Sequence, residues 1–118
     1  MNTNDEEREK RYLKLKGKFL DISFGNGLIE ITVLQNVSEF YAEGKTMNTL
    51  LYEQKYDMRD SSLILSAKIN GERVETIEVD LNQFKVVQSR GIDNTYSDYH
   101  ESIVNLVNKN MNLIKACA

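Results

Sequence analysis

The sequence predicts an α+β fold, in which a C-terminal helix and one or two further helices pack on a largely antiparallel β-sheet of about five strands. Three observations carry this prediction. Asn70-Gly71 lies between two runs rich in β-forming residues, and residues 29–33 alternate between apolar and polar side chains. Apolar residues then recur at helical spacing over residues 103–114. The chain has 118 residues, which fits a single domain over residues 1–118.

The central hairpin is the best-defined local prediction. Asn and Gly both tolerate the positive φ angles of a type I′ turn, so residues 63–69 and 73–81 are expected to pair as adjacent strands. The register has two alternatives. A strict two-residue turn places Leu65 opposite Thr76, whereas one bulged residue places Leu65 opposite Ile77. Because a slip of one residue exchanges the two faces of a strand, the buried face of the second strand stays open at this point.

The residues before the hairpin are expected to begin with a helix and two strands. The helix covers about residues 1–15 and has acidic residues near its start, which suits the helix dipole. The strands cover residues 18–23 and 28–34, and the Gly-containing segment 24–27 supplies the turn between them.

A second helical region is expected between these strands and the hairpin. Asn36 and Ser38 are alternative caps for a helix that starts near residue 39. Gly44 is expected to break this region into two pieces. Residues 55–61 are charged and polar, which is typical of a surface loop.

The end of the chain is expected to contain one further strand and one helix. A turn at residues 80–82 leads to the strand, which includes Val86 and Val87. Asp98, with Glu101 three residues later, resembles the capping box of a helix start. The helix that follows is expected to lie across the sheet.

The charge of the chain is unevenly distributed. The net charge of −3 and the isoelectric point of about 5.2 argue against a nucleic-acid binder that is basic throughout. Basic residues are nevertheless concentrated near the N-terminus. They are either a solvated helix and strand edge or a patch that contacts phosphates. The candidate patch consists of Arg8, Arg11, Lys14, Lys16 and Lys18, together with Lys10.

The sequence offers little for metal, cofactor or covalent chemistry. Cys117 is the single cysteine and cannot form an internal disulfide, and one histidine with one distant cysteine cannot make a structural zinc site. Residues 24–27 lack the Lys-Ser/Thr ending of a phosphate-binding P-loop. We therefore expect no cofactor and no metal, and assign no catalytic residue. Without an apolar leader or a long apolar run, we expect a cytoplasmic protein that does not enter a membrane.

The polar segment after the last strand is the strongest candidate for a binding surface. It offers an Arg donor fork, amides and a nearby helix N-terminus, a combination that suits anions. The alternative is a polar turn whose residues merely allow the bend. The candidate residues are Gln88, Arg90, Gly91, Asn94 and His100.

Two kinds of side chain near this segment have alternative interpretations. His100 could be a solvent-facing or capping residue, and a catalytic role would need a nucleophile or a carboxylate close to it. Tyr52, Tyr56, Tyr96 and Tyr99 could offer stacking faces for bases, or they could pack on the sheet with wet hydroxyl groups.

A family signal is spread over several stretches of the chain. These stretches are Lys16-Gly17-Lys18-Phe19, Leu34-Gln35-Asn36-Val37 with Glu39-Phe40, Glu43-Gly44, the hairpin of residues 60–80, the segment 86–91, and Tyr99-His100 leading into residues 110–114. In this order they resemble the C-terminal part of PcfJ-like proteins, a family found with plasmids and other mobile elements of bacteria. The resemblance covers about residues 11–115, with residues 16–115 as the C-terminal region. It implies a stand-alone or excised C-terminal domain, because family members are longer upstream.

One departure from the family pattern bears on chemistry. After the Glu43-Gly44 stretch, members of the family carry Met-His-His-Cys-Val, whereas this chain has Met47-Asn48-Thr49-Leu50-Leu51. His and Cys are common metal ligands and a common base and nucleophile pair. If the family motif performs such chemistry, its loss implies a substituted member, unless the local alignment has simply diverged.

The resemblance and the missing motif favour a non-enzymatic binding domain of a mobile-element protein that acts in or near conjugative transfer. Its partners would be protein components of a transfer apparatus or DNA. One alternative is an enzyme, or a degenerate enzyme domain, with a polar anion-binding site near residues 88–100. Another is a protein–protein interaction module, which an exposed apolar patch would support.

Overall fold

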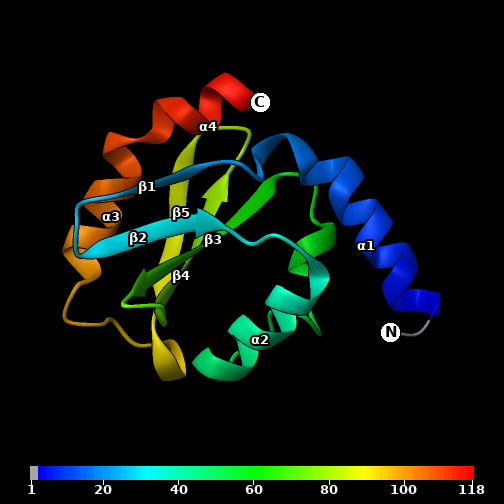
Figure 1. Cartoon of the computed structure of the whole chain (residues 1–118), viewed down its shortest axis with the longest axis horizontal. Helices are drawn as coiled ribbons and strands as arrows, with labels where there is room; N and C mark the ends of the chain where they lie inside the picture. The colour runs from blue at the N-terminus through cyan, green and yellow to red at the C-terminus, as the bar shows by residue number, and fades with distance from the viewer. Residues whose placement is uncertain (1–2) are drawn as a thin grey trace.

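The computed structural model describes residues 3–118, and it describes side chains from residue 5 onward. One antiparallel sheet in the order β1-β2-β3-β4-β5 carries four helices (Figure 1). The strands are β1 (Ser23–Gly25), β2 (Ile29–Val33), β3 (Ser62–Ile69), β4 (Glu72–Asp80) and β5 (Lys85–Arg90). The helices are α1 (Thr3–Lys16), α2 (Val37–Met47), α3 (His100–Lys109) and α4 (Met111–Cys117), with short 3-10 turns at Gly17–Phe19, Tyr56–Met58 and Ile92–Asn94. The predicted α+β class with a five-stranded antiparallel sheet is confirmed. The first two residues of the predicted N-terminal helix lie outside the described residues.

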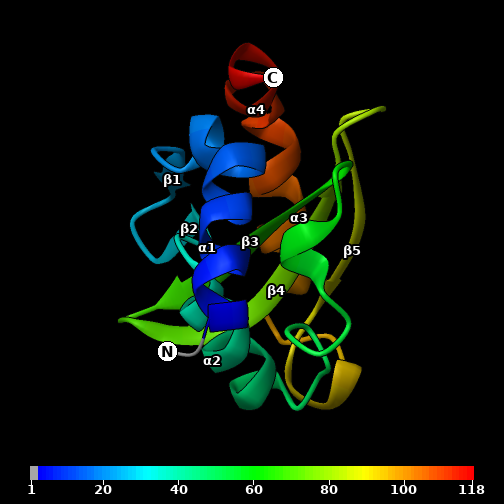
Figure 2. The same ribbon diagram turned by 90° about the vertical axis from the view of Figure 1, so that its right-hand side faces the viewer.

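The helices cover the two faces of the sheet unequally. Helices α3 and α4 lie on one face, and α1 and α2 lie on the other (Figures 1 and 2). The α3 face buries the larger apolar cluster, which includes Ile29, Ile31, Val33, Leu63, Leu65, Ile77, Val79, Ile103, Val107 and Ile114. The α2 face buries a smaller cluster of Tyr12, Leu34, Val37, Phe40, Leu51 and Ile64. The smaller apolar cluster leaves part of the α2 face to polar side chains.

The prediction of a strand over residues 18–23 is wrong. The chain forms a 3-10 turn at Gly17–Phe19, and β1 begins only at Ser23. Phe19 and Ile22 are both buried in the α3-side cluster. A spacing of three residues brings two side chains to one side of a helical turn but to opposite faces of a strand, which explains the outcome.

Of the two predicted N-caps of helix α2, Asn36 and Ser38, the structure has Asn36. The side-chain oxygen of Asn36 accepts from the backbone N–H of Glu39 at 2.9 Å. Gly44 does not break the helix, contrary to the prediction. Its position is buried beneath the chain at residues 49–51, and an added Cβ would lie 3.1 Å from the carbonyl oxygen of Thr49 and 3.3 Å from Cβ of Leu51. Glycine therefore allows this segment to approach the helix closely.

The prediction that residues 55–61 are a surface loop is also wrong in part. The segment contains the 3-10 turn at Tyr56–Met58, and the carboxylate of Asp57 is fully buried. Arg8 of α1 donates to both oxygens of Asp57, at 3.1 and 2.5 Å. The segment is therefore fixed to α1 by a two-bond ion pair.

The bulged register of the central hairpin is the one that forms. Leu65 pairs with Ile77, and the register shifts between Ala67 and Lys68. Beyond the shift, Lys68 pairs with Arg73. Opposite residues of an antiparallel pair share a face, so the bulge turns Arg73 toward the α2 face, which strict alternation would not do.

On that face the bulge completes the bonding of a buried acid. Glu43 of α2 has no exposed surface, and its carboxylate accepts from Ser66, Arg73 and Thr76 at 2.9, 2.7 and 2.5 Å. Burial raises the pKa of Glu43, and the hydrogen bonds from Thr76, Ser66 and Arg73 oppose this rise. The carboxylate thus joins α2 to two central strands.

A second register shift has a similar effect on β5. Glu78 pairs with Gln88, but the next residue of β4, Val79, pairs with Val86. Val86 therefore packs against the α3-side cluster, while Gln88 turns to the α2 face with its partner Glu78. Strict alternation would have put Val86 and Gln88 on the same face.

The predicted C-terminal helix is divided into two. Helix α3 ends at Lys109 and α4 begins at Met111, and the side-chain amide of Asn110 donates to the carbonyl oxygen of Leu106 at 2.8 Å. The predicted capping by Asp98 is wrong. The N-cap position is Tyr99, which makes no side-chain cap, and Asp98 is exposed.

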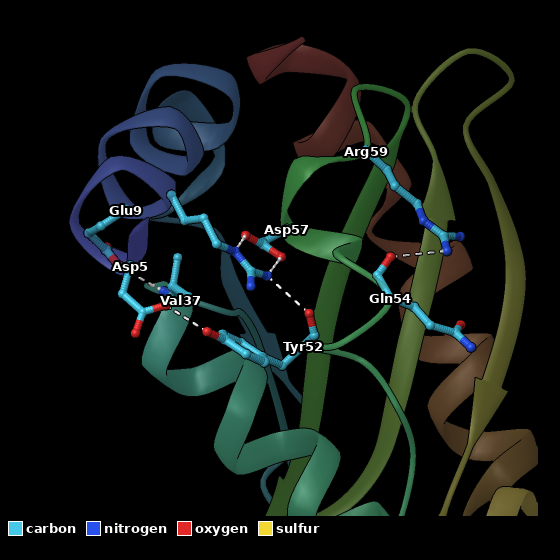
Figure 3. Close-up of polar contacts among 8 residues, drawn as sticks. Asp5, Glu9, Val37, Tyr52, Gln54, Asp57 and Arg59 are labelled. Atoms are coloured by element: carbon cyan, nitrogen blue, oxygen red, sulfur yellow. Dashed lines mark hydrogen bonds and ion pairs between the residues drawn. The ribbon is translucent and has the colours of Figure 1, made fainter. Parts of the chain in front are cut away.

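Helix α1 is anchored at both its middle and its end. The carboxylate of Glu9 accepts from the backbone N–H of Val37 at 2.9 Å (Figure 3), at the first turn of α2, where a negative charge is favoured. The ammonium group of Lys16 is buried and donates to the carbonyl oxygen of Arg59 at 2.7 Å. Burial lowers the pKa of Lys16 to about 8, although the negative charges of Asp60 and Asp57 oppose the change.

We predict that Gly44→Ala destabilises the protein by about 1–2 kcal/mol, because the added methyl group overpacks the contact with residues 49–51. Urea unfolding at neutral pH measures the difference. Gly17→Ala is the matched control, since nothing lies within 4 Å of a Cβ at that position. Equal or greater stability of Gly44→Ala would contradict the close-approach explanation, because alanine is otherwise the better helix former.

We also predict that the pH dependence of stability changes in Lys16→Met. Between the folded pKa of about 8 and the ordinary value of 10.5, the Lys16 side chain binds more protons in the unfolded chain than in the folded chain. The free energy of unfolding therefore rises with pH there, by at most about 1.4 kcal/mol per pH unit from this group. Urea unfolding between about pH 7 and about pH 9.5 should show that Lys16→Met loses this rise. The control Lys14→Met, at an exposed position of the same helix, should retain it.

Candidate binding site

The α2 face of the sheet contains a hollow of about 340 Å³ beside the edge strand β5. We call it the tip hollow. Its walls come from the segment after α2, from β3, β4 and β5, and from the turn that follows β5. The lining residues are Thr49, Leu50, Leu51, Gln54, Tyr56, Ile64, Thr76, Glu78, Gln88, Arg90 and Asn94. Three of the predicted binding residues, Gln88, Arg90 and Asn94, thus meet around one concave surface.

The register shift in β5 presents Gln88 and Arg90 to the tip hollow. The amide of Gln88 donates to Glu78 at 3.2 Å, and the hydroxyl group of Ser62 donates to the other oxygen of Glu78 at 2.7 Å. Arg90 donates to the carbonyl oxygen of Ser89 at 3.0 Å. The wall therefore combines a guanidinium group and amide donors with one oriented carboxylate.

A short turn brings Asn94 to the rim of the tip hollow. Asp93 and Asn94 have φ angles of 56° and 61°, a left-handed conformation that Asp and Asn tolerate better than most residues. The side-chain amide of Asn48, the C-cap of α2, donates to Asp93 at 2.7 Å. This bond ties the end of α2 to the turn after β5.

The turn is held from the opposite face of the sheet by a third buried carboxylate. Glu75 of β4 has no exposed surface and accepts from the hydroxyl groups of Ser89 and Ser97 at 2.6 and 2.7 Å. It also accepts from the backbone N–H of Ser97 at 2.8 Å and from Nδ1 of His100 at 3.0 Å. Burial raises the pKa of Glu75, but these hydrogen bonds outweigh it, so the pKa lies below its ordinary value.

His100 is a member of this buried network and does not line the tip hollow. Its ring stacks on that of Tyr96, with 3.7 Å between centroids and 10° between planes. The guanidinium carbon of Arg90 lies 4.6 Å from the centroid of the same tyrosine ring. The solvent-facing and capping interpretations of His100 therefore give way to a supporting role, in which Glu75, His100 and Tyr96 hold Arg90 in place.

Gly91, the remaining predicted binding residue, acts through its backbone geometry. It is buried, and an added Cβ would lie 3.0 Å from the carbonyl oxygen of Val74. Its N–H donates to the carbonyl oxygen of Thr95 at 2.6 Å, which closes the turn. Gly91 thus allows β5 to turn away close to β4.

The predicted basic patch is divided by the fold. Arg8 bonds Asp57 and Lys16 is buried, so neither offers a free charge. Arg11, Lys14 and Lys18 are exposed.

The rings of three candidate tyrosines already contact cations of the same chain. The guanidinium carbons of Arg8 and Arg59 lie 4.1 and 3.6 Å from the ring centroids of Tyr52 and Tyr56. Tyr96 contacts Arg90 in the same way. One face of each ring is therefore used within the molecule.

Sequence reasoning missed most residues of the tip hollow outside β5 and the turn after it, although Tyr56 is one of the predicted stacking tyrosines. The missed residues are Thr49, Leu50, Leu51, Gln54, Ile64, Thr76 and Glu78. In the sequence, the segment 49–51 attracts attention only because it lacks the His and Cys residues of the family motif. The structure brings that segment against the same hollow as Gln88 and Arg90.

The described residues contain no group of three or more His, Cys, Asp or Glu side chains that could hold a metal ion. Within residues 3–118, no helix has the length and apolar character needed to cross a membrane.

We predict that Glu75→Gln lowers the free energy of unfolding at neutral pH by about 1–3 kcal/mol, because a neutral amide cannot satisfy the same donors. The pKa of Glu75 is lowered by folding, so its contribution is present above its ordinary value of 4.5 and is lost as the pH falls through the folded value. Unfolding curves at neutral and acidic pH should show the difference from the wild type shrinking in acid. Glu72→Gln, at an exposed position of the same strand, is the control. A difference that does not change with pH would contradict this role.

Comparison with known proteins identifies the family to which this chain belongs. No curated protein and no solved structure matches the chain. The family model described as PcfJ-like protein matches residues 1–104. This match spans the tip hollow, the segment 49–51 and the Glu75 network. The chain therefore belongs to the PcfJ-like protein family.

Proposed function

We propose that this chain is a non-enzymatic binding domain of a bacterial mobile-element protein that acts in or near conjugative transfer, and that the tip hollow is its binding site. The mobile-element setting rests on the family alone. The binding role rests on the tip hollow, in which residues from distant parts of the sequence converge.

The observation that carries the proposal is the set of polar groups around the tip hollow. Arg90, Gln88 and Asn94 offer donors that suit a carboxylate or a phosphate, and Gln54 adds a further amide. Leu50, Leu51 and Ile64 line the same hollow with apolar surface. A hollow with convergent polar groups and an apolar wall suits an anion-bearing group of a partner molecule.

The turn is also preorganised. The Glu75 network and the bond between Asn48 and Asp93 fix the positions of Arg90 and Asn94 from two sides. Fixed donors lose less conformational entropy when a ligand binds, which favours specific recognition.

The alternatives receive less support from this arrangement. The lining of the tip hollow includes no His, Cys, Ser or Lys side chain, and its one carboxylate, Glu78, is already engaged by Ser62 and Gln88. For an interaction module, exposed large apolar residues such as Leu13, Leu28, Val87 and Leu113 lie on separate elements, and only Ile92, Tyr96 and Tyr99 gather in one turn of the described residues.

Binding of small anionic probes to the isotope-labelled chain, followed by backbone amide NMR, tests the proposal. We expect inorganic phosphate and a short peptide with a free carboxyl end to shift the resonances of residues 49–51 and 88–95. Arg90→Ala should weaken the binding by about tenfold or more, because it removes the charge-assisted bonds. Lys109→Ala removes an exposed positive charge from α3 and should leave the affinity unchanged.

Two results would contradict the proposal. One is binding that Arg90→Ala and Lys109→Ala weaken equally, which would indicate attraction to net charge alone. The other is catalytic turnover by the purified chain that a single substitution in the tip hollow abolishes.

A further inference from the structure

A second concave surface lies along α1, outside the tip hollow. It is a groove of about 810 Å³ between α1 and the segment that carries Tyr52, Lys55 and Met58; Figure 2 shows α1 beside this segment. We call it the cationic groove, because four exposed basic residues line it beside Arg8, whose charge is paired with Asp57. They are Lys10, Arg11 and Lys14 of α1 and Lys55 of the opposite wall, and all four are exposed. The cationic groove shares no lining residue with the tip hollow.

Bonds within the chain engage two acids that lie close to the cationic groove. Asp57 is buried against Arg8, and Asp5, which lines the groove, accepts a hydrogen bond of 2.6 Å from the hydroxyl group of Tyr52 (Figure 3). Glu7 is the exposed acid that lines the groove. Among residues 5–118, no ion pair joins Lys10, Arg11, Lys14 or Lys55 to a carboxylate.

The arrangement concentrates positive charge on a chain whose net charge is −3. Lys10 and Lys14 are separated by one helical turn and are neighbours on the helix surface. Lys55 faces them from a turn with a φ angle of 56°, a left-handed conformation that costs a lysine about 1 kcal/mol or more. Adjacent like charges repel one another, and an anion with several charges would relieve this repulsion.

We infer that the cationic groove binds the phosphate backbone of nucleic acid. The guanidinium group of Arg11 suits bidentate contact with a phosphate, and the three lysines supply point charges beside it. Release of counterions from the nucleic acid would drive the binding, so it needs no large apolar surface.

The lining of the groove argues against two other anionic partners, an acidic protein surface and an anionic membrane. A protein interface usually has an apolar core, whereas Tyr52 and Met58 are the apolar contributors to this groove. An anionic membrane would need an apolar helix face, but Tyr12 is buried in the core and Leu13 is the exposed apolar residue of α1. The inference does not depend on the function proposed for the tip hollow.

Fluorescence anisotropy with labelled oligothymidine and with a labelled duplex of the same length tests the inference. The wild-type chain should bind at least one of them, with an affinity that falls steeply as salt is added. The double variant Arg11→Ala/Lys14→Ala should lose about tenfold in affinity at low salt, and the salt slope should fall by about 1 for each residue removed. Comparison of the two probes shows whether single or double strands supply the phosphates.

Three controls make the result decisive. Lys85→Ala/Lys109→Ala removes two exposed charges elsewhere and should leave the binding unchanged. Thermal unfolding checks that each variant is folded. A polyglutamate peptide should compete poorly, because it lacks phosphates.

The inference is overturned if neither probe binds at low salt, or if the two double variants weaken the binding equally. Effective competition by polyglutamate would assign the groove to acidic protein segments. Loss of binding in Arg90→Ala alone would assign the nucleic acid to the tip hollow. Failure of nucleic-acid binding leaves the phosphate and peptide titrations of the tip hollow unaffected, so the two proposals fail separately.

Discussion

A carboxylate can be buried only when hydrogen-bond donors replace the water that it loses, and this structure meets the condition three times. Glu43, Asp57 and Glu75 have no exposed surface. Their donors come from other elements, so each acid joins parts of the chain that are distant in sequence. Among the described residues, every buried side-chain nitrogen and oxygen atom has a hydrogen-bond partner. Removal of the charged partner, Arg8 of Asp57 or Arg73 of Glu43, would leave a buried charge without its counter-ion, at a cost of about 3–5 kcal/mol.

One register shift completes the bonding of Glu43, and the other shapes the tip hollow. One shift turns Arg73 to the α2 face, where it completes the shell of Glu43. The other turns Gln88 to the same face, while Val86 stays in the α3-side core. Both shifts therefore place polar side chains on the face that has the smaller apolar cluster. The surplus of polar groups there supports the proposal that this face binds a ligand.

The sequence could predict the features that depend on local chemistry. The Asn70-Gly71 turn, the Asn36 cap and the antiparallel class all follow from neighbouring residues. Local pattern could not show that Gly44 would lie under residues 49–51, because that contact depends on packing. It also could not bring residues 49–51 to Gln88 and Arg90, since their meeting depends on a bulge that strict alternation does not reveal. The individual residues of the tip were therefore visible in the sequence, but the hollow that they form was not.

The segment between α2 and β3 links the two concave surfaces. Thr49, Leu51 and Gln54 line the tip hollow, while Tyr52 and Lys55 line the cationic groove. Two contacts fix this segment, namely the close approach at Gly44 and the ion pair between Arg8 and Asp57. A wall shared by two surfaces transmits any displacement from one to the other, unless such contacts hold it. Since both contacts are buried or partly buried, the segment should keep its position when either surface is occupied, and the two surfaces should bind their ligands independently.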